Sequence, residues 1–239
     1  MRPMSEPKDD LRGFASPPCL AHEIDPAWPG AAALDPQQAL DVARWRTAER
    51  SRLLAQRAAL SVETRKAAAI AVAHHLDQLL AQRFADLAGL TISAWWPIKA
   101  ELDLRDWLAG LARRGARAAL PVVTLRSAPL VFREWTLDTK MERGFWNIPV
   151  PASGPGLIPD IILSPLVGWD DGGYRLGYGG GYFDRTLAAI KPRPLAIGIG
   201  LDAARLATIF PQAHDIAMQA IVTESGVARL DPGAADRPA

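Results

Sequence analysis

The positions of apolar and polar residues predict two helices near the start of the chain. Residues 38–59 have helical spacing, with Leu40, Leu53 and Leu54 as apolar positions among many arginines. Ser61 is typical of a helix N-cap, and Glu63 fits the first turn of the helix that would follow. The apolar positions expected in this second helix are Ala67, Ile70, Ala71, Leu76, Leu79 and Leu80.

Beyond residue 90, short apolar segments alternate with helical ones. β-Branched and aromatic residues predict strands over 91–98, 117–123, 130–135, 161–167, 194–199 and 220–227. Helices are expected over 104–114, ending at Gly115, and over about 182–190, whereas prolines predict an irregular stretch over 137–159. Apolar strands separated by helices are typical of a parallel sheet that is covered on both faces. The expected fold is therefore α/β, with a mostly parallel, Rossmann-like sheet in a single domain.

The first 36 residues differ in composition from the rest. Seven of the twenty prolines lie between Pro3 and Pro36, and this density opposes both helices and sheet ladders. We expect a poorly ordered, proline-rich tail over 1–36, one domain over 37–230 and a flexible end over 231–239.

Composition and charge argue against several classes of protein. Hydrophobic residues make up 49% of the chain and charged residues 22%, which excludes a wholly disordered protein. The net charge of +1 argues against a dedicated nucleic-acid or membrane-surface protein. The single cysteine, Cys19, cannot form an intramolecular disulfide, and no apolar run reaches signal-peptide or membrane-spanning length. We expect a cytoplasmic monomer.

Glycines are concentrated where the strand over 161–167 meets the next helix. Seven of the nineteen glycines lie between Gly168 and Gly181. Because glycine has no Cβ, the backbone N–H groups of such a loop can converge on phosphate oxygens at a helix N-terminus. Arg175 adds a forked cation that suits phosphate, and Asp184 offers an oxygen ligand for Mg²⁺. The alternative interpretation is a surface loop with a capping aspartate.

The glycine segment does not match two standard nucleotide-binding fingerprints. A dinucleotide loop would need glycine at position 182, which is Tyr182, and a Walker loop needs a Gly-Lys pair, which the chain lacks. The run from Arg175 to Asp184, RLGYGGGYFD, instead closely resembles the signature of the 5-formyltetrahydrofolate cyclo-ligases, also called 5,10-methenyltetrahydrofolate synthetases. Phe183 is a departure, since most members have tyrosine there.

Other segments resemble the same family in the same order. Arg46, Arg50 and Arg57 match basic positions of the family's amino-terminal helix. Residues 97–101, PIKAE, resemble a strand end that is followed by a glutamate, and residues 146–149, WNIP, resemble the folate-side loop. His214 and Asp215, with residues 221–224, resemble the closing segment, so that the likeness spans about residues 44–225.

The resemblance implies a ligase that uses ATP to convert 5-formyltetrahydrofolate to 5,10-methenyltetrahydrofolate, with release of ADP and phosphate. The formyl oxygen would be phosphorylated, which makes it a good leaving group. The ATP-binding residues implied by the resemblance are Arg46, Arg50, Arg175, Leu176, Gly177, Tyr178, Gly179, Gly180, Gly181, Tyr182 and Phe183. The residues implied for folate are Trp96, Glu101, Trp146 and Tyr182. Asp184 and Asp215 would hold Mg²⁺.

The residues alone leave alternatives open. The arginines also suit a solvated helix face, Glu101 a helix start, and Trp96 and Trp146 the core. A second class of function is a non-catalytic sensor of the same fold that binds a phosphorylated metabolite and recruits a partner through its tail. A third is an isomerase or acyl-CoA transferase on the broad fold of the sugar-phosphate isomerases and CoA transferases, which fold analogy alone supports.

Overall fold

The computed structural model describes residues 36–231. The predicted tail and the flexible end therefore lie outside the described residues, except for Pro36, which begins the first helix, and Asp231. The helices are α1 (Pro36–Ala59), α2 (Val62–Arg83), α3 (Arg105–Gly110) and α4 (Tyr182–Ala189), with 3-10 turns at Leu111–Arg114, Phe145–Asn147 and Asp202–Ala204. The strands are β1 (Thr91–Ser93), β2 (Arg117–Val122), β3 (Val131–Glu134), β4 (Met141–Arg143), β5 (Pro149–Pro151), β6 (Gly156–Leu157), β7 (Ile161–Pro165), β8 (Gly168–Asp170), β9 (Arg175–Leu176), β10 (Leu195–Ile199), β11 (Arg205–Leu206), β12 (Ala220–Thr223) and β13 (Gly226–Leu230). Within this part of the chain, no helix combines the length and the hydropathy that crossing a membrane requires.

The main sheet has parallel strands at its centre. Across residues 36–231 it contains eight strands in the order β13-β12-β10-β7-β1-β2-β3-β6. The strands from β12 to β2 in this order are parallel, whereas β13, β3 and β6 pair antiparallel at the edges. Parallel strands end at the same edge, so β1, β7 and β10 present their carboxyl ends on one side, where open α/β sheets bind ligands. The mostly parallel sheet expected from the sequence is confirmed at its centre.

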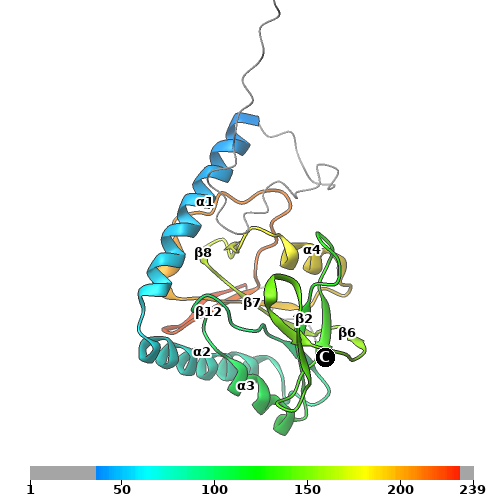
Figure 1. The fold of residues 1–239 in the computed structure, drawn as a ribbon. Coiled ribbons are helices and arrows are strands. Elements are labelled where there is room, and N and C mark those ends of the chain that lie inside the picture. Colours follow the sequence, from blue (N-terminus) through cyan, green and yellow to red (C-terminus); the bar gives the residue numbers. More distant parts are fainter. Residues whose placement is uncertain (1–35, 232–239) are drawn as a thin grey trace, which may run out of the picture.

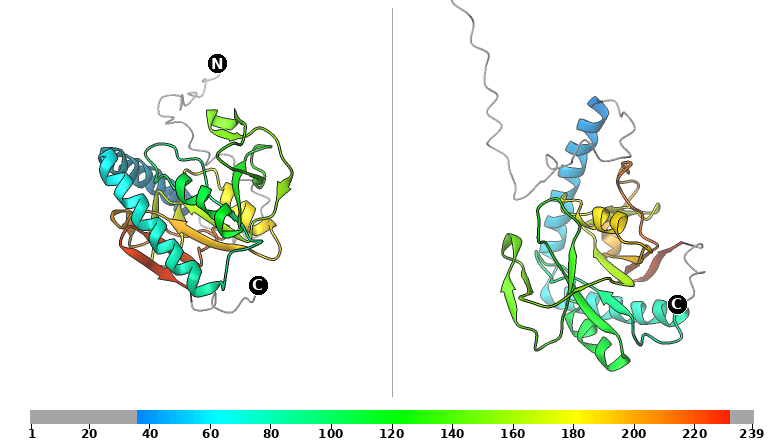
Figure 2. Two further views of the ribbon diagram at one scale, coloured as in Figure 1. Left: turned by 90° about the horizontal axis from the view of Figure 1, so that it is seen from below. Right: turned by 90° about the vertical axis from the view of Figure 1, so that its right-hand side faces the viewer.

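Helices cover both faces of this sheet. On one face, Leu76 of α2 and Leu108 of α3 share a hydrophobic cluster with Leu163 of β7. On the other face, Leu53 of α1 and Leu187 of α4 share a cluster with Ile162, which precedes Leu163 on β7. Neighbouring residues of β7 thus point to opposite faces, as in any strand. Figures 1 and 2 show α2 and α3 on one side of the sheet and α4 on the other, which confirms the predicted layers.

The first two helices form as predicted, but parts of their apolar faces differ. Ser61 caps α2 by accepting the N–H of the residue three positions on. The buried residues of α2 are Ala68, Ala69, Val72, Leu76, Leu79 and Leu80. Ala67 and Ile70 are exposed because, at 100° per residue, they lie roughly 150° from the centre of that stripe. Leu40 is exposed too, since the amino-terminal half of α1 extends past the sheet (Figure 1).

Three predicted segments need correction. The strand predicted over 91–98 is limited to β1, because the chain turns away through Pro97 and a tight turn at Lys99 and Ala100. The irregular stretch over 137–159 contains β4 to β6, and the prolines of β5 are tolerated in a two-stranded ribbon. The strand over 220–227 is a hairpin of β12 and β13, with Thr223 opposite Gly226.

The glycine-rich segment over 168–181 is only partly a loop. β8 and β9 form a hairpin that joins β11 in a small separate sheet. Gly173 has φ 83° in the connecting turn, and its N–H donates to the carbonyl oxygen of Asp170 at 2.9 Å. The loop proper is Gly177–Gly181, between β9 and α4. The glycines therefore serve two purposes, a tight hairpin turn and the entry into a helix.

Candidate active site

The loop Gly177–Gly181 leads directly into α4. Gly181 is the N-cap residue, with φ 60°, and no side chain caps the helix. The first-turn N–H groups of Tyr182, Phe183 and Asp184 have no acceptor within the helix. They can therefore bind an anion, which the helix dipole also favours.

Arg50 and Arg185 hold the backbone of this loop. Arg50 Nε donates to Gly177 O at 2.7 Å, and Arg185 Nη1 donates to Gly180 O at 2.5 Å. Gly179 lies between them with φ 102°, a left-handed value that glycine adopts without strain. Because arginines take these carbonyls, the protein itself fixes the loop conformation. Arg50, predicted to bind nucleotide, thus lies directly against the loop.

Arg175 and Asp184 form a buried ion pair beside the loop. Arg175 Nη2 lies 2.7 Å from Asp184 Oδ2, and the two side chains are 4% and 15% exposed. Asp184 Oδ1 accepts the Ile216 N–H at 3.0 Å, and Arg175 Nη1 donates to Ile216 O at 3.3 Å. Leu176 and Phe183 pack in the adjacent hydrophobic cluster. The Leu176 side chain is therefore buried and that of Phe183 partly buried, so their backbone is the part that could contact a ligand at the loop.

Arg46 and Asp215 form a second ion pair. Arg46 Nη2 lies 2.5 Å from Asp215 Oδ2. The same guanidinium donates to Ile209 O at 3.0 Å and to Phe210 O at 2.8 Å. The Gln212 N–H donates to Asp215 Oδ2 at 2.7 Å. Arg46 therefore ties α1 to the segment over 209–215.

The two predicted metal ligands lie on segments that touch, because Asp184 accepts a hydrogen bond from the residue after Asp215. Each carboxylate is paired with an arginine. No group of three or more His, Cys, Asp or Glu side chains able to hold a metal occurs among residues 36–231. Mg²⁺ commonly binds through one or two carboxylates, with water and phosphate oxygens completing its shell. The pair could thus hold Mg²⁺ only together with such oxygens.

Glu101 follows β1 at the end of a strained turn. Lys99 and Ala100 have φ values of 47° and 61°. These left-handed values cost a residue with a Cβ about 1–2 kcal/mol each. The Glu101 N–H donates to Ile98 O at 2.9 Å, and the Ile98 N–H donates to Glu101 Oε2 at 2.9 Å. The carboxylate therefore stabilises the turn that positions it.

Glu101 lies in a buried polar cluster with Arg57, Trp95 and Tyr178. Burial raises the pKa of Glu101, while the Ile98 N–H, the charge of Arg57 and the Tyr178 hydroxyl lower it. Burial and the charge of Glu101 also raise the pKa of Tyr178. Within the described residues, Glu101 Oε1 and Trp95 Nε1 are buried without a well-formed hydrogen bond. Orphaned polar atoms are rare in protein interiors, so they mark a place where a ligand could bind.

Arg57, in the last turn of α1, connects this cluster to the rest of the site. Its side chain is buried, and it donates to Lys99 O at 3.3 Å and to Leu166 O at 3.3 Å. Its Nη2 donates to the Tyr178 hydroxyl at 2.5 Å. One buried cation thus links α1, the turn before Glu101, the end of β7 and the glycine loop.

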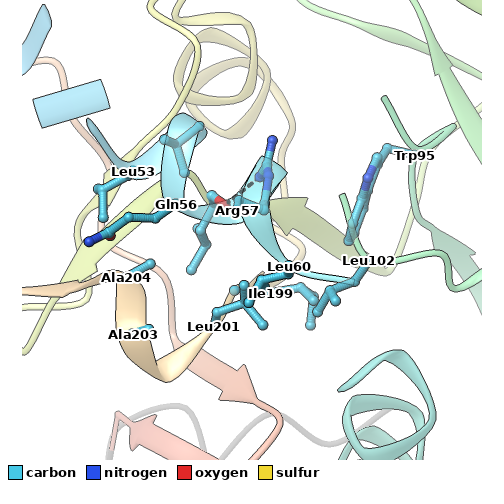
Figure 3. A pocket seen from close by; sticks show the side chains of 13 residues that line it. Leu53, Gln56, Arg57, Leu60, Trp95, Leu102, Ile199, Leu201, Ala203 and Ala204 are labelled. Atoms are coloured by element: carbon cyan, nitrogen blue, oxygen red, sulfur yellow. Dashed lines mark hydrogen bonds between the residues drawn. The ribbon is translucent and has the colours of Figure 1, made fainter. Parts of the chain in front are cut away.

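A mostly apolar pocket of about 120 Å³ lies beside Arg57 (Figure 3). Leu60 and Ile199 lie next to Arg57, with Trp95 on one side and Ala204 on the other (Figure 3). The pocket opens near the carboxyl ends of β7 and β10, and among the described residues the loop Gly177–Gly181 is not part of its lining. It therefore borders the Glu101 cluster rather than the glycine loop.

The structure brings two of the predicted aromatic residues into contact, and the third packs against another cluster. Trp146 is 43% exposed, and its ring meets the Tyr182 ring edge-on with centroids 5.4 Å apart. Tyr182 also accepts the Ser127 N–H through its hydroxyl at 3.3 Å. Trp96, in contrast, packs against the cluster under α2 and α3, with the Arg105 guanidinium 4.6 Å from its ring centroid. Trp146 and Tyr182 thus form an aromatic surface at the start of α4.

One known family matches the part of the chain that contains the residues described above. The model of the 5-formyltetrahydrofolate cyclo-ligase family matches residues 42–224, a range that contains the glycine loop, Glu101 and both ion pairs. The chain belongs to this family.

Relatives and solved structures agree with the family assignment. The 5-formyltetrahydrofolate cyclo-ligase of Escherichia coli is 31% identical over 146 residues, which are 57% of this chain and 79% of that protein. The cyclo-ligase of Mycolicibacterium smegmatis is 32% identical over 145 residues, covering 57% of this chain and 75% of the relative. The 5,10-methenyltetrahydrofolate synthetase of Aquifex aeolicus matches with a TM-score of 0.67 at 27% identity, over 81% of this chain and 95% of that structure. The synthetase from Mycoplasma pneumoniae shares the fold, with a TM-score of 0.61 at 23% identity, over 75% of this chain and 98% of that one.

Sequence reasoning did not select several residues of the Glu101 cluster. The sequence motif indicates Arg57 on the helix but not its burial, which depends on contacts with segments 42 to 121 residues away. The sequence points to Trp96, whereas the structure places the neighbouring Trp95 in the cluster. A signal for the choice existed, since adjacent residues leaving a strand point to opposite sides. The side on which Glu101 lies, however, is set by the turn at Lys99 and Ala100.

Proposed function

We propose that this chain uses ATP to close the ring of 5-formyltetrahydrofolate, giving 5,10-methenyltetrahydrofolate, ADP and phosphate. The family match over residues 42–224 carries the proposal. The architecture supports it, since a helix start without a side-chain cap and a buried carboxyl with an orphaned oxygen are both associated with Tyr178. The backbone of Tyr178 is part of the loop that leads into α4, and its side chain belongs to the polar cluster around Glu101.

The nucleotide would bind at the loop Gly177–Gly181. The open N–H groups at the start of α4 suit phosphate oxygens, and Arg50 adds positive charge next to Gly177. Arg46 and Arg175 stay candidates for phosphate contacts, although each would have to give up part of its ion pair with Asp215 or Asp184. Prearranged donors of this kind are each worth about 3 kcal/mol in a transition state.

The chemistry explains why ATP is required. The formamide oxygen is a poor leaving group, and transfer of the γ-phosphoryl group to it forms an O–P bond while ADP leaves. Nitrogen 10 of the folate then attacks the formyl carbon, the C–O bond breaks, phosphate departs, and the nitrogen loses its proton. The task of the chain is to hold the two substrates in line and to stabilise the phosphoryl charge, without a protein nucleophile.

The folate would bind between Glu101 and the aromatic surface of Trp146 and Tyr182. The orphaned Oε1 of Glu101 can accept a hydrogen bond from the donor-rich edge of a pterin. The exposed Trp146 ring beside Tyr182 offers a flat apolar wall. Trp96 is less suited to the role predicted for it, because Arg105 covers one face of its ring.

Mg²⁺ would join the site through Asp184 and Asp215. The donor chemistry fits, because both hydrogen bonds that Asp215 accepts fall on Oδ2, while its Oδ1 faces only the His214 ring, at 3.8 Å, within the described chain. When bound, the ion would neutralise phosphate charge. The cytoplasmic location and the monomeric state stay predictions from the sequence.

The test is an absorbance assay of the purified protein with Mg·ATP and 5-formyltetrahydrofolate. We expect the methenyl chromophore to appear in proportion to the ADP released. A folded sample that binds a phosphorylated metabolite but forms no chromophore at any ATP concentration would support the sensor alternative instead.

A further inference from the structure

Tyr178 belongs to the glycine loop, but its side chain turns away from the loop toward Glu101. Its hydroxyl accepts a hydrogen bond from Arg57 Nη2 at 2.5 Å, and it lies near enough to Glu101 to lower the pKa of that carboxyl. The ring lies between two cations, with Arg57 Cζ 5.9 Å and Lys99 Nζ 5.2 Å from its centroid. Polar and cation–π contacts therefore hold this side chain in place.

Tyr178 and Glu101 thus lie in one buried polar cluster. The carboxyl oxygen Oε1 is buried, although no well-formed hydrogen bond within residues 36–231 satisfies it. Besides Arg57, the side chains that act on the Glu101 carboxyl are those of Tyr178 and Trp95. Because Oε1 is buried, a ligand can reach it only if a neighbouring side chain moves. Trp95 is a buried member of the hydrophobic cluster under α2 and α3, whereas Tyr178 packs only at the margin of the second cluster and is carried by a loop flanked by glycines. Tyr178 is the one that can move.

We infer that Tyr178 is a positioning residue that couples the two substrate sites: it covers Glu101 in the free protein and leaves it when the glycine loop binds nucleotide. This inference rests on the proposed function. In the free protein the loop is held from both sides, by Arg50 at Gly177 and by Arg57 at Tyr178. Phosphate at the loop competes for Arg50 and reshapes the backbone that carries Tyr178.

The coupling has a defined sign. Nucleotide and folate both bind better to the state in which Tyr178 has left Glu101, so each shifts the population toward that state. By linkage, the factor by which nucleotide tightens folate binding equals the factor by which folate tightens nucleotide binding. Arg57 stays buried in both states, because its bonds to Lys99 O and Leu166 O do not involve the loop.

The experiment is calorimetric titration of the full chain with 5-formyltetrahydrofolate, with and without a non-hydrolysable ATP analogue and Mg²⁺. For the wild type we expect the analogue to tighten folate binding about fivefold or more, within the usual range of such couplings. The Tyr178→Phe variant lacks the hydroxyl that accepts from Arg57 and lies near Glu101. It should bind folate more tightly than the wild type without nucleotide, with a coupling factor close to one.

Tyr174→Phe is the matched control, since it makes the same change in the turn between β8 and β9. It should retain the wild-type coupling factor. In steady-state assays the KM for 5-formyltetrahydrofolate should fall as ATP rises for the wild type and for Tyr174→Phe, and stay flat for Tyr178→Phe.

The outcomes separate this inference from the proposed function. A wild type that turns over folate, with Tyr178→Phe keeping the wild-type coupling factor, overturns the role of Tyr178 alone. A folded wild type that binds no folate, with or without nucleotide, overturns the proposed function itself.

Discussion

The arginines of the site mostly bind the protein itself. Arg46 and Arg175 pair with aspartates, while Arg50 and Arg57 donate to carbonyl oxygens and to the Tyr178 hydroxyl. Partly buried cations need such partners, because an isolated buried charge is very unfavourable. The consequence is a candidate site in which the positive charge is held in a fixed orientation by the protein itself.

The buried ion pair of Arg175 and Asp184 should contribute to the stability of the fold. Asp184→Asn leaves the nearly buried Arg175 without its counter-charge, and such a loss typically destabilises a fold by about 3–5 kcal/mol. Adding Arg175→Met should restore much of the stability, because it removes the unpaired buried charge. The asparagine oxygen at position 184 can still accept the Ile216 N–H in both variants. Urea unfolding of both variants measures this.

Asp171→Asn is the control, since its pair with Arg205 is exposed on both sides and should matter little. If Asp184→Asn is as stable as this control, then the ion pair of Arg175 and Asp184 does not stabilise the fold. That result would favour a role for Asp184 in metal binding only.

Glu101 gives a pH-dependent prediction. Burial raises its pKa in the folded protein, so between about pH 4.5 and that raised value the unfolded chain releases its proton first. The wild-type free energy of unfolding therefore falls as pH rises through this window. Glu101→Gln has no such proton, and its stability relative to wild type should increase with pH.

Urea unfolding across pH 4–8 tests this, with the exposed Glu142→Gln as control. A difference between Glu101→Gln and wild type that does not change with pH would contradict a raised pKa.

At the scale of elements, the turn before Glu101 carries strain that glycine would remove. Ala100→Gly should raise the free energy of unfolding by about 0.5–1 kcal/mol, since relief of the left-handed strain exceeds the added entropy of the unfolded chain. Ala55→Gly in the exposed face of α1 should lower it by about 1 kcal/mol. Thermal or urea unfolding that gave the two substitutions the same sign would contradict this account of the turn.

Periodicity and capping signals located most elements but not their pairing. Ser61 and Gly115 marked helix ends correctly, because capping is a local interaction. The glycines of the β8–β9 hairpin predict a single loop, and the residues of the edge hairpin of β12 and β13 predict a single strand, so neither hairpin follows from the sequence pattern. Such strands are short, and their partners lie outside any local pattern.

At the scale of the molecule, the sequence motifs correctly predict the family, whereas contacts between distant segments cannot be predicted from them. The motifs named Arg46, Asp184 and Asp215, but nothing local shows that arginines neutralise both carboxylates. Likewise, Glu101 was named, but the partnership of Arg57 and Tyr178 over it depends on the packed sheet.

Helix α1 is held in place by contacts with residues that are synthesised much later. Arg46 of α1 meets Asp215 across 169 positions, and Arg57 meets Tyr178 across 121. Contacts of such long range form slowly, because much chain must be ordered before they form. A nascent chain on the ribosome therefore cannot complete this candidate site until nearly the whole domain has emerged, and α1 cannot make these contacts earlier.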